Sequence, residues 1–215
     1  IFFSATMIPV MYYKKLLSGN PEDFAVYANS PFDREKRLIL VAKDVSSRYT
    51  RRGQEEYMRI AAYIKQTVMQ KKGNYLAFFP SYRMLQDVMA CTGPQLDTSI
   101  RCICQTSGMT EEEREAFLHE FEQKRKEDEG LLGFCVMGGI FGEGIDLKED
   151  SLIGAIIVGT GIPQICRERE ILKQYYDGRN EDGFAYAYRY PGMNKVLQSA
   201  GRVIRTAQDR GVVLL

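Results

Sequence analysis

Gln198, Arg202 and Arg205 are the residues whose types and spacing first suggest chemistry. On a helix that turns about 100° per residue, offsets of zero, four and seven place the three side chains within an arc of about 60°. Val196 and Val203 fall on the opposite side, so the predicted helix is amphipathic. Two planar guanidinium groups match phosphate oxygens, which makes a phosphate clamp one interpretation of this face. A solvated polar face is the other, and the three residues alone favour it.

Other candidates lie where apolar, strand-like runs end. They are polar residues at or just before the start of the next predicted helix: Ser81, Tyr82, Arg83, Gln105 and Thr106. A helix start with a hydroxyl cap can bind a phosphate through backbone N–H groups, and a tyrosine can stack on a base. Ordinary helix capping is the alternative at these positions.

A glycine-rich segment, GGIFGEGIDL (138–147), follows another apolar run. Its glycines, among them Gly139 and Gly144, permit positive φ and a close backbone approach to a ligand. The carboxylates of Glu143 and Asp146 would repel a phosphate unless they serve a sugar hydroxyl, a water or a neighbouring arginine. A structural turn is the alternative.

The elements that position these residues alternate between strands and helices. Strands are predicted at 37–43, 75–79, 100–104, 131–137, 153–159 and 211–215. Because most of these runs are continuously apolar, they are typical of strands covered on both faces of a parallel sheet. Helices are predicted at 52–71, at 82–90 and from Thr110, where Glu113 completes a capping box. The pattern predicts a doubly wound α/β sheet, with ligands at the carboxyl ends of its strands.

Two further segments complete this map. FFSAT is predicted to end a strand, with Ser4 and Thr6 as small hydroxyl residues at its tip. Residues 163–192 are predicted to form a helix, a polar loop and a tyrosine-rich stretch that ends in a Pro-Gly turn. We interpret them as an elaboration within the domain. The chain starts without Met and stops within an apolar run, so we expect a fragment of a longer protein.

Composition argues against several classes of function. The formal net charge of +1 gives no bulk attraction to nucleic acid, so any basic surface must be local. No apolar run approaches the about 20 residues that cross a bilayer, and no secretory signal is visible. With His119 as the only histidine, multi-histidine metal sites and a Ser-His triad are not expected. The five cysteines lack paired CxxC spacing, so we expect reduced thiols in the cytosol and no zinc site.

The sequence also lacks the GxxxxGK[ST] segment that cradles phosphates, and an acidic, magnesium-binding strand end is not evident. The chain alone is therefore not expected to hydrolyse a nucleotide efficiently. It can instead offer arginine fingers to a phosphate that another domain holds.

Four segments occur in an informative order: FSAT, FFPSY, GGIFGEGIDL and QSAGRVIRT. Together they resemble motifs III, IV, V and VI of a superfamily 2 helicase, and the forms GEGIDL and QxxGRxxR resemble its DinG/XPD branch. The long segment between the last two motifs is also similar to that branch. The resemblance spans nearly all of the chain. It implies a RecA-like three-layer α/β/α fold with a mostly parallel sheet, as a single domain over residues 1–215 with the elaboration at 163–192.

The resemblance also implies a mechanism. Proteins of this branch use two RecA-like domains, with ATP and Mg2+ in the cleft between them, and translocate 5′ to 3′ on single-stranded DNA. The N-terminal motor domain, which this chain lacks, would hold most of the nucleotide. Arg205 would be the arginine finger on the γ-phosphate, Arg202 would contact the phosphates as well, and Gln198 would orient the attacking water or the phosphate.

The remaining roles follow from the same resemblance. The nucleotide site and its link to the DNA would involve Glu143, Gly144, Asp146 and Gly201. The DNA-binding residues would be Ser81, Tyr82, Arg83, Gln105, Thr106 and Gly139. Ser4 and Thr6 would couple the two sites. The branch often carries an iron–sulfur cluster on four cysteines of the first motor domain; the cysteines here do not match that pattern, so the cluster stays open and no metal is expected in this chain.

Two alternatives to a DNA helicase remain at this point. One is an inactive nucleic-acid-binding scaffold of the same fold, and the other is an RNA helicase. No membrane partner is expected, and a cytoplasmic location, nucleoid-associated in a bacterium, follows from the resemblance. The pathway stays open between repair, transcription and plasmid or phage biology.

Overall fold

The computed structural model describes residues 1–215 except 5, 19, 21, 142–146 and 148–150. Its described strands form one sheet in the order β1-β6-β5-β2-β4-β3, and every neighbouring pair is parallel. The strands are β1 (Arg37–Leu40), β2 (Asn74–Phe79), β3 (Ile100–Cys104), β4 (Gly130–Val136), β5 (Gly154–Ile157) and β6 (Gly211–Leu214). The predicted parallel α/β sheet is confirmed, because each apolar run from 37–43 onward overlaps one of these strands.

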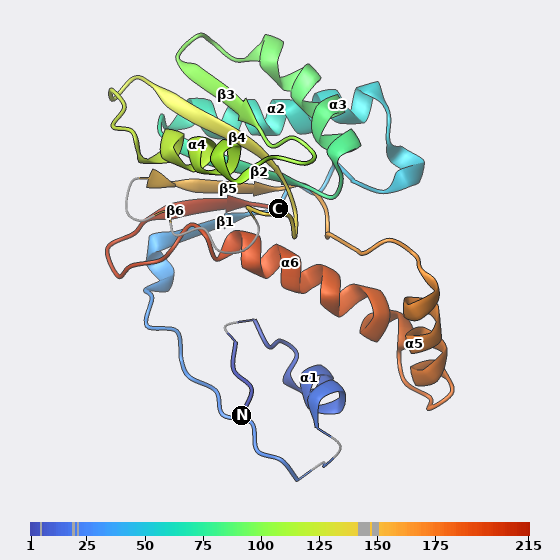
Figure 1. Cartoon of the computed structure of the whole chain (residues 1–215). Coiled ribbons are helices and arrows are strands. Elements are labelled where there is room, and N and C mark those ends of the chain that lie inside the picture. The colour runs from blue at the N-terminus through green and yellow to red at the C-terminus, as the bar shows by residue number, and fades with distance from the viewer. Residues whose placement is uncertain (5, 19, 21, 142–146, 148–150) are drawn as a thin grey trace.

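Helices cover both faces of the sheet. They are α2 (Gln54–Gln70) and α3 (Tyr82–Thr92) on one face, and α4 (Glu111–Glu122) and α6 (Tyr190–Ala200) on the other, as Figure 1 shows. Alternate side chains of the central strand β2 enter the two layers: Phe79 packs with α2 and α3, whereas Phe78 packs with α4 and α6. Both rings are fully buried, which explains the continuously apolar run.

Two of the predicted helix starts are confirmed by their caps, whereas α2 begins at Gln54, two residues later than predicted and without a side-chain cap. Ser81 Oγ accepts a hydrogen bond of 3.3 Å from the Met84 N–H at the start of α3. At the start of α4, Thr110 and Glu113 form the reciprocal capping box. These caps satisfy backbone donors that the first turn of a helix leaves without partners.

The elaboration differs from its prediction. After α5 (Arg167–Asp177), the tyrosine-rich stretch is itself helical, with a π-helix at Ala185–Arg189 that continues into α6. Pro191 lies in the first turn of α6, so the predicted Pro-Gly turn is wrong. Proline cannot donate to the carbonyl four residues earlier. Arg169 of α5 donates to that carbonyl, Ala187 O, at 2.8 Å, and this bond replaces the backbone hydrogen bond that Pro191 cannot make.

The N-terminal segment also departs from its prediction. Residues 1–4 form no strand, and Ile1 and Phe3 are almost fully exposed. An apolar run becomes a strand only when a neighbouring strand supplies hydrogen bonds, and Figure 1 shows the N-terminus away from the sheet. The next helix, α1 (Val10–Leu17), packs Tyr12 against the tyrosines of the elaboration. No helix among the described residues is long and apolar enough to cross a membrane.

Candidate functional site

The segment that carries Gln198, Arg202 and Arg205 is helical only in its first part. Helix α6 ends at Ala200, and the predicted single helical face for the three side chains is therefore wrong. The Arg202 and Val203 N–H groups make the last turn-like bonds, to Ser199 O and Ala200 O, each at 3.3 Å. The helix stops because Gly201 is a poor helix residue and because Val203, 1% exposed, turns inward into the core.

Residues 201–209, which we name the arginine loop, are organised around a buried carboxylate, and Lys36 also donates to Ala207 O at 2.7 Å. Asp209 is 5% exposed, and its Oδ2 accepts hydrogen bonds from the N–H groups of Arg205 (2.6 Å) and Thr206 (2.7 Å). Its Oδ1 accepts a third bond, from Thr206 Oγ1, at 2.6 Å. Sequence reasoning missed Asp209, although a threonine three residues before an aspartate is a recognisable turn-forming spacing. The carboxylate fixes the backbone from which Arg205 projects.

The two arginines differ in exposure. Arg205 is exposed, whereas Arg202 is 9% exposed and lies against the domain. Two guanidinium groups that project side by side are therefore not what the loop presents. Gln198, one turn earlier on α6, is half-buried. Arg205 is the residue of the three that is best placed to reach a ligand outside this domain.

The arginine loop does not lie at the carboxyl ends of the strands, where the α/β pattern predicts ligands. It leads through Arg210 into Gly211, the first residue of β6, so it lies at the amino end of that strand. In a parallel sheet the helix after each strand runs back to the amino edge, and α6 does so here. Leu147, which ends the glycine-rich segment, shares a buried cluster with Val203. Glu143, Gly144 and Asp146 lie outside the described residues.

A second group of candidates meets at the carboxyl edge of the sheet, around Gln105. Gln105 is 2% exposed, its Oε1 accepts from the Val136 N–H at 2.9 Å, and its Nε2 donates to Tyr82 Oη at 2.9 Å. It thereby connects the ends of β3 and β4 with the start of α3. A Cβ added at Gly139 would lie 3.1 Å from Gln105 Nε2, so the backbone passes close above this amide.

The same edge continues across glycines with positive φ. Gly138 (φ 68°) lies beneath Lys195 of α6, because a Cβ there would be 3.0 Å from Lys195 Cε. Gly161 (φ 58°), after β5, lies next to the same lysine: a Cβ there would be 3.4 Å from Lys195 Cβ. Sequence reasoning missed Lys195, whose place over the strand ends depends on the path of α6. We name Tyr82, Gln105, Gly138, Gly139, Lys195, Gly159 and Gly161 the strand-tip ledge.

The remaining candidates are placed as follows. Arg83 and Thr106 are exposed at the same edge as the ledge, and Ser81 is half-buried with its hydroxyl engaged in the cap of α3. Ser4 and Thr6 contact each other at 3.3 Å between their hydroxyl oxygens, in the N-terminal segment. Figure 1 shows that segment away from the sheet, so the structure does not bring this pair to either group.

The described residues set limits on cofactor chemistry. They contain no group of three or more His, Cys, Asp or Glu side chains that could hold a metal ion. Burial raises the pKa of the Cys102, Cys104 and Cys135 thiols, which therefore stay protonated near neutral pH. Arg205, exposed on an anchored backbone, fits a phosphate, whereas a set of carboxylates for Mg2+ is not present in this part of the chain.

Known proteins resemble the chain in sequence and fold. A family model described as a helicase C-terminal domain matches residues 64–215. A probable ATP-dependent helicase of Methanocaldococcus jannaschii is 26% identical over 200 residues, which cover 86% of this chain and 29% of that protein. A regulator of telomere elongation helicase 1 homolog of Drosophila yakuba is 29% identical over 150 residues, 65% of this chain and 15% of that protein. A solved structure titled XPD helicase gives a TM-score of 0.67 at 24% identity, over 83% of this chain and 31% of that chain.

The layered parallel sheet is thus a RecA-like helicase domain, as the sequence predicts. The chain belongs to the helicase C-terminal domain family, in its XPD/Rad3/DinG branch. It spans less than a third of the length of either curated relative described above.

Proposed function

We propose that this chain is the second motor domain of an ATP-dependent DNA helicase, acting as one unit over residues 1–215 with its elaboration at 163–192. The observation that carries the proposal is the arginine loop, in which an exposed Arg205 stands on a backbone fixed by the buried Asp209 carboxylate. A group held in one geometry stabilises developing charge without reorganisation. A first motor domain elsewhere in the protein would bind ATP, which supplies the reactive phosphoryl group, together with Mg2+, which would offset the charge of the phosphates.

In this proposal Arg205 stabilises the γ-phosphate, because a guanidinium fork matches phosphate oxygens. Arg202, being largely buried, contacts phosphates only when the partner domain closes onto the loop; its burial also supports a role in keeping the loop in place. Gln198 orients the attacking water or the phosphate from the preceding turn. Gly201 caps α6, with its N–H 2.9 Å from Leu197 O, and lets the loop leave the helix.

The strand-tip ledge is the proposed track for single-stranded DNA. Tyr82 offers a ring for base stacking, and Arg83 and Lys195 offer positive charge. The glycines, which have no Cβ, let a strand approach the backbone closely. Helix α6 joins the two regions, because it carries Lys195 over the ledge and ends at the arginine loop. Closure of the two motor domains on ATP would therefore move the DNA contacts, in the 5′ to 3′ direction that the family resemblance implies.

The test is Arg205→Ala in the full-length protein. Loss of an arginine finger lowers turnover by about 10³-fold or more, so we expect kcat for ATP to fall by that order while ATP affinity changes by less than about fivefold. Arg210→Ala is the matched control, because Arg210 is also exposed and lies just beyond the loop. Wild-type turnover in Arg205→Ala would contradict the assignment.

The same assay decides between the remaining alternatives. Stimulation of ATP turnover by single-stranded DNA supports the DNA helicase, and stimulation by single-stranded RNA alone would replace it with an RNA helicase. Absence of ATP turnover in the full-length protein, with nucleic-acid binding retained, would identify a scaffold. Movement of a strand with a labelled 5′ or 3′ end gives the direction of translocation.

A further inference from the structure

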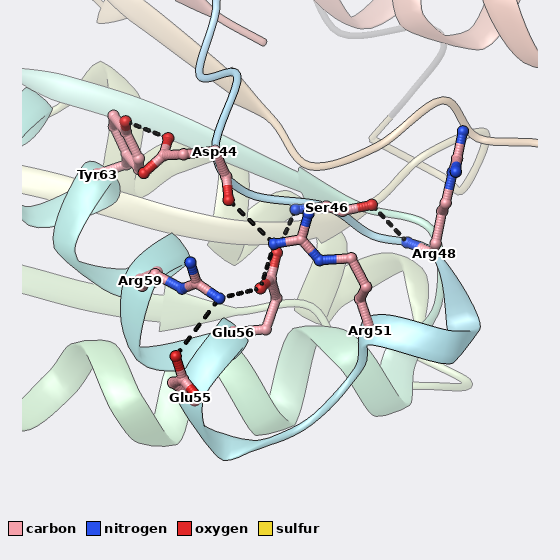
Figure 2. A network of polar contacts seen from close by, with 8 residues as sticks. All are labelled: Asp44, Ser46, Arg48, Arg51, Glu55, Glu56, Arg59 and Tyr63. Carbon is pink, nitrogen blue, oxygen red and sulfur yellow. Dashed lines mark hydrogen bonds and ion pairs between the residues drawn. The ribbon is translucent and has the colours of Figure 1, made fainter.

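The loop after β1, which reaches α2, is built around a buried glutamate. Glu56 is 3% exposed, and its carboxylate accepts a hydrogen bond from the Ser46 N–H. It also accepts one hydrogen bond from each guanidinium group of Arg51 and Arg59, both at 2.9 Å. Figure 2 shows these groups converging on Glu56, with Tyr63 bonded to Asp44 beside them. Three donors on one buried carboxylate hold the loop in a single conformation.

The arginines of this loop fall into two kinds. Arg51 and Arg59 both form ion pairs with Glu56, and Arg59 also pairs with Glu55 at 3.6 Å, so two carboxylates offset their two charges locally. Arg48 is exposed, and Figure 2 shows its side chain extending away from Glu56. Arg52 donates from Nε to Ser47 O at 3.0 Å and lies 5.8 Å from the ring centroid of Tyr49. Tyr49 is 84% exposed, so most of its ring faces solvent although the loop is held in place.

This loop adjoins the strand-tip ledge. Gly159 has a φ of 87°, and a Cβ there would lie 2.2 Å from Ser47 Oγ, so the loop after β1 rests on the loop after β5. Both loops follow strands of the same parallel sheet and therefore lie at its carboxyl edge. In the sheet order, β1 is the edge strand opposite β3, so the ledge extends from Gln105 toward Arg48 across the whole sheet.

We propose that residues 47–52 continue the single-strand track, with Tyr49 stacking on a base and Arg48 contacting a backbone phosphate. This inference rests on the proposed function and adds a binding surface to it. An exposed ring beside unneutralised arginines is the combination that binds single strands without sequence preference. The buried Glu56 network explains why the surface is ready-made, because it presents the ring and the guanidinium groups without a cost of ordering the loop.

The test measures binding of a fluorescent single-stranded oligonucleotide to the full-length protein at several salt concentrations. Stacking on one ring contributes about 1–3 kcal/mol, so Tyr49→Ala should weaken binding by about 5- to 150-fold. Arg48→Ala should weaken binding and reduce the slope of log K against log salt by about one. Arg48→Lys should restore the slope, because the phosphate contact needs a charge.

Matched controls exist elsewhere in the chain. Lys126 is 81% exposed in the turn before β4, at the amino edge of the sheet. Tyr175 on α5 also pairs with an arginine, since Arg179 lies 3.6 Å from its ring centroid. Lys126→Ala and Tyr175→Ala should bind within about twofold of wild type.

The outcomes separate this inference from the proposed function. A wild-type protein that does not bind single strands contradicts both. The second outcome overturns the proposed surface alone. In it, the wild-type protein binds single strands and shows DNA-stimulated ATP turnover, but Arg48→Ala and Tyr49→Ala leave the affinity and the salt slope unchanged. Weakening in both variants, at unchanged melting temperature and unchanged turnover without DNA, supports it.

Discussion

The arginine loop and the strand-tip ledge lie at opposite edges of one sheet and are built differently. In the arginine loop, a single buried carboxylate on Asp209 holds two N–H groups and a hydroxyl. In the ledge, close backbone contacts at glycines and the Gln105 amide connect the ends of four strands. A loop organised around a buried carboxylate can present one side chain with precision, whereas a row of backbone along the strand ends suits an extended polymer.

The difference also shows how the two regions can communicate. Helix α6 contacts the ledge through Lys195 and Gly192, where a Cβ on Gly192 would lie 2.7 Å from Thr160 O. The same helix ends at the arginine loop. In the proposed function, α6 would carry a displacement of one edge to the other and so link ATP turnover to the single-strand track.

Asp209→Ala should give the largest effect and is confined to the arginine loop. Removing the carboxylate leaves buried donors without an acceptor, so we expect unfolding to become easier by about 3 kcal/mol. Because Arg205 then loses its fixed backbone, kcat for ATP should also fall, by about 10- to 100-fold. Urea denaturation and steady-state ATP turnover of the full-length protein measure the two quantities.

Asp209→Asn is the control, because the amide keeps one acceptor oxygen and nearly the same volume. It should fall between wild type and Asp209→Ala in both measurements. Oligonucleotide affinity without nucleotide should stay within about twofold of wild type in both variants, since the ledge is untouched. A stable protein with wild-type kcat in Asp209→Ala would show that the carboxylate does not position Arg205.

Sequence reasoning predicted the sheet and the caps well, because both depend on local patterns. The continuously apolar run at 75–79 and the capping box at Thr110 each carry their own signal. It failed where a helix end was set by tertiary packing: nothing local in QSAGRVIRT required Val203 to turn into the core after Gly201. The predicted arc for Gln198, Arg202 and Arg205 assumed a helix that the fold ends five residues earlier than Arg205.

The candidate site shows the same division. The ledge residues Tyr82 and Gln105 were found because they lie within three residues of the ends of β2 and β3. Lys195 and Arg48 were missed because contacts between distant segments bring them to this edge. Lys195 lies against Gly138, and Arg48 follows Ser47, which lies against Gly159. The amino-edge position of the arginine loop follows from the direction of α6, which becomes evident only once β6 is placed in the sheet.

Gly159→Ala should give a smaller effect, confined to the ledge. An alanine there adopts a φ of 87° with strain of about 1–3 kcal/mol, and its Cβ would meet Ser47 Oγ at 2.2 Å. We expect a loss of stability of about 2–3 kcal/mol and weaker oligonucleotide binding, with DNA-independent ATP turnover unchanged. The double variant Ser47→Gly/Gly159→Ala removes the clash and should recover part of the stability, leaving the backbone strain.

Gly53→Ala is the matched control for that substitution. Its φ of 171° is ordinary extended backbone, and a Cβ there would meet nothing within 4 Å. Because Gly53 is the N-cap of α2, where glycine is preferred over alanine, the substitution should cost about 1 kcal/mol, less than Gly159→Ala. If Gly159→Ala binds oligonucleotide like Gly53→Ala and is equally stable, the contact between the two loops does not shape the ledge.

Lys15→Ala should give the smallest effect, because it removes an ion pair that lies apart from both regions. Lys15 of α1 bonds to Glu181, and this lowers the pKa of Glu181 from 4.5 and raises the pKa of Lys15 from 10.5. The pair therefore stabilises the fold fully between these two values. Its contribution is lost as the pH falls through the lowered Glu181 pKa or rises past the raised Lys15 pKa.

The melting temperatures of Lys15→Ala and wild type should differ slightly near neutral pH and converge in acid, while ATP turnover and oligonucleotide affinity stay the same. A change in either activity would mean that α1, which also contacts Asn194 of α6 through Tyr13, takes part in the link between the two edges.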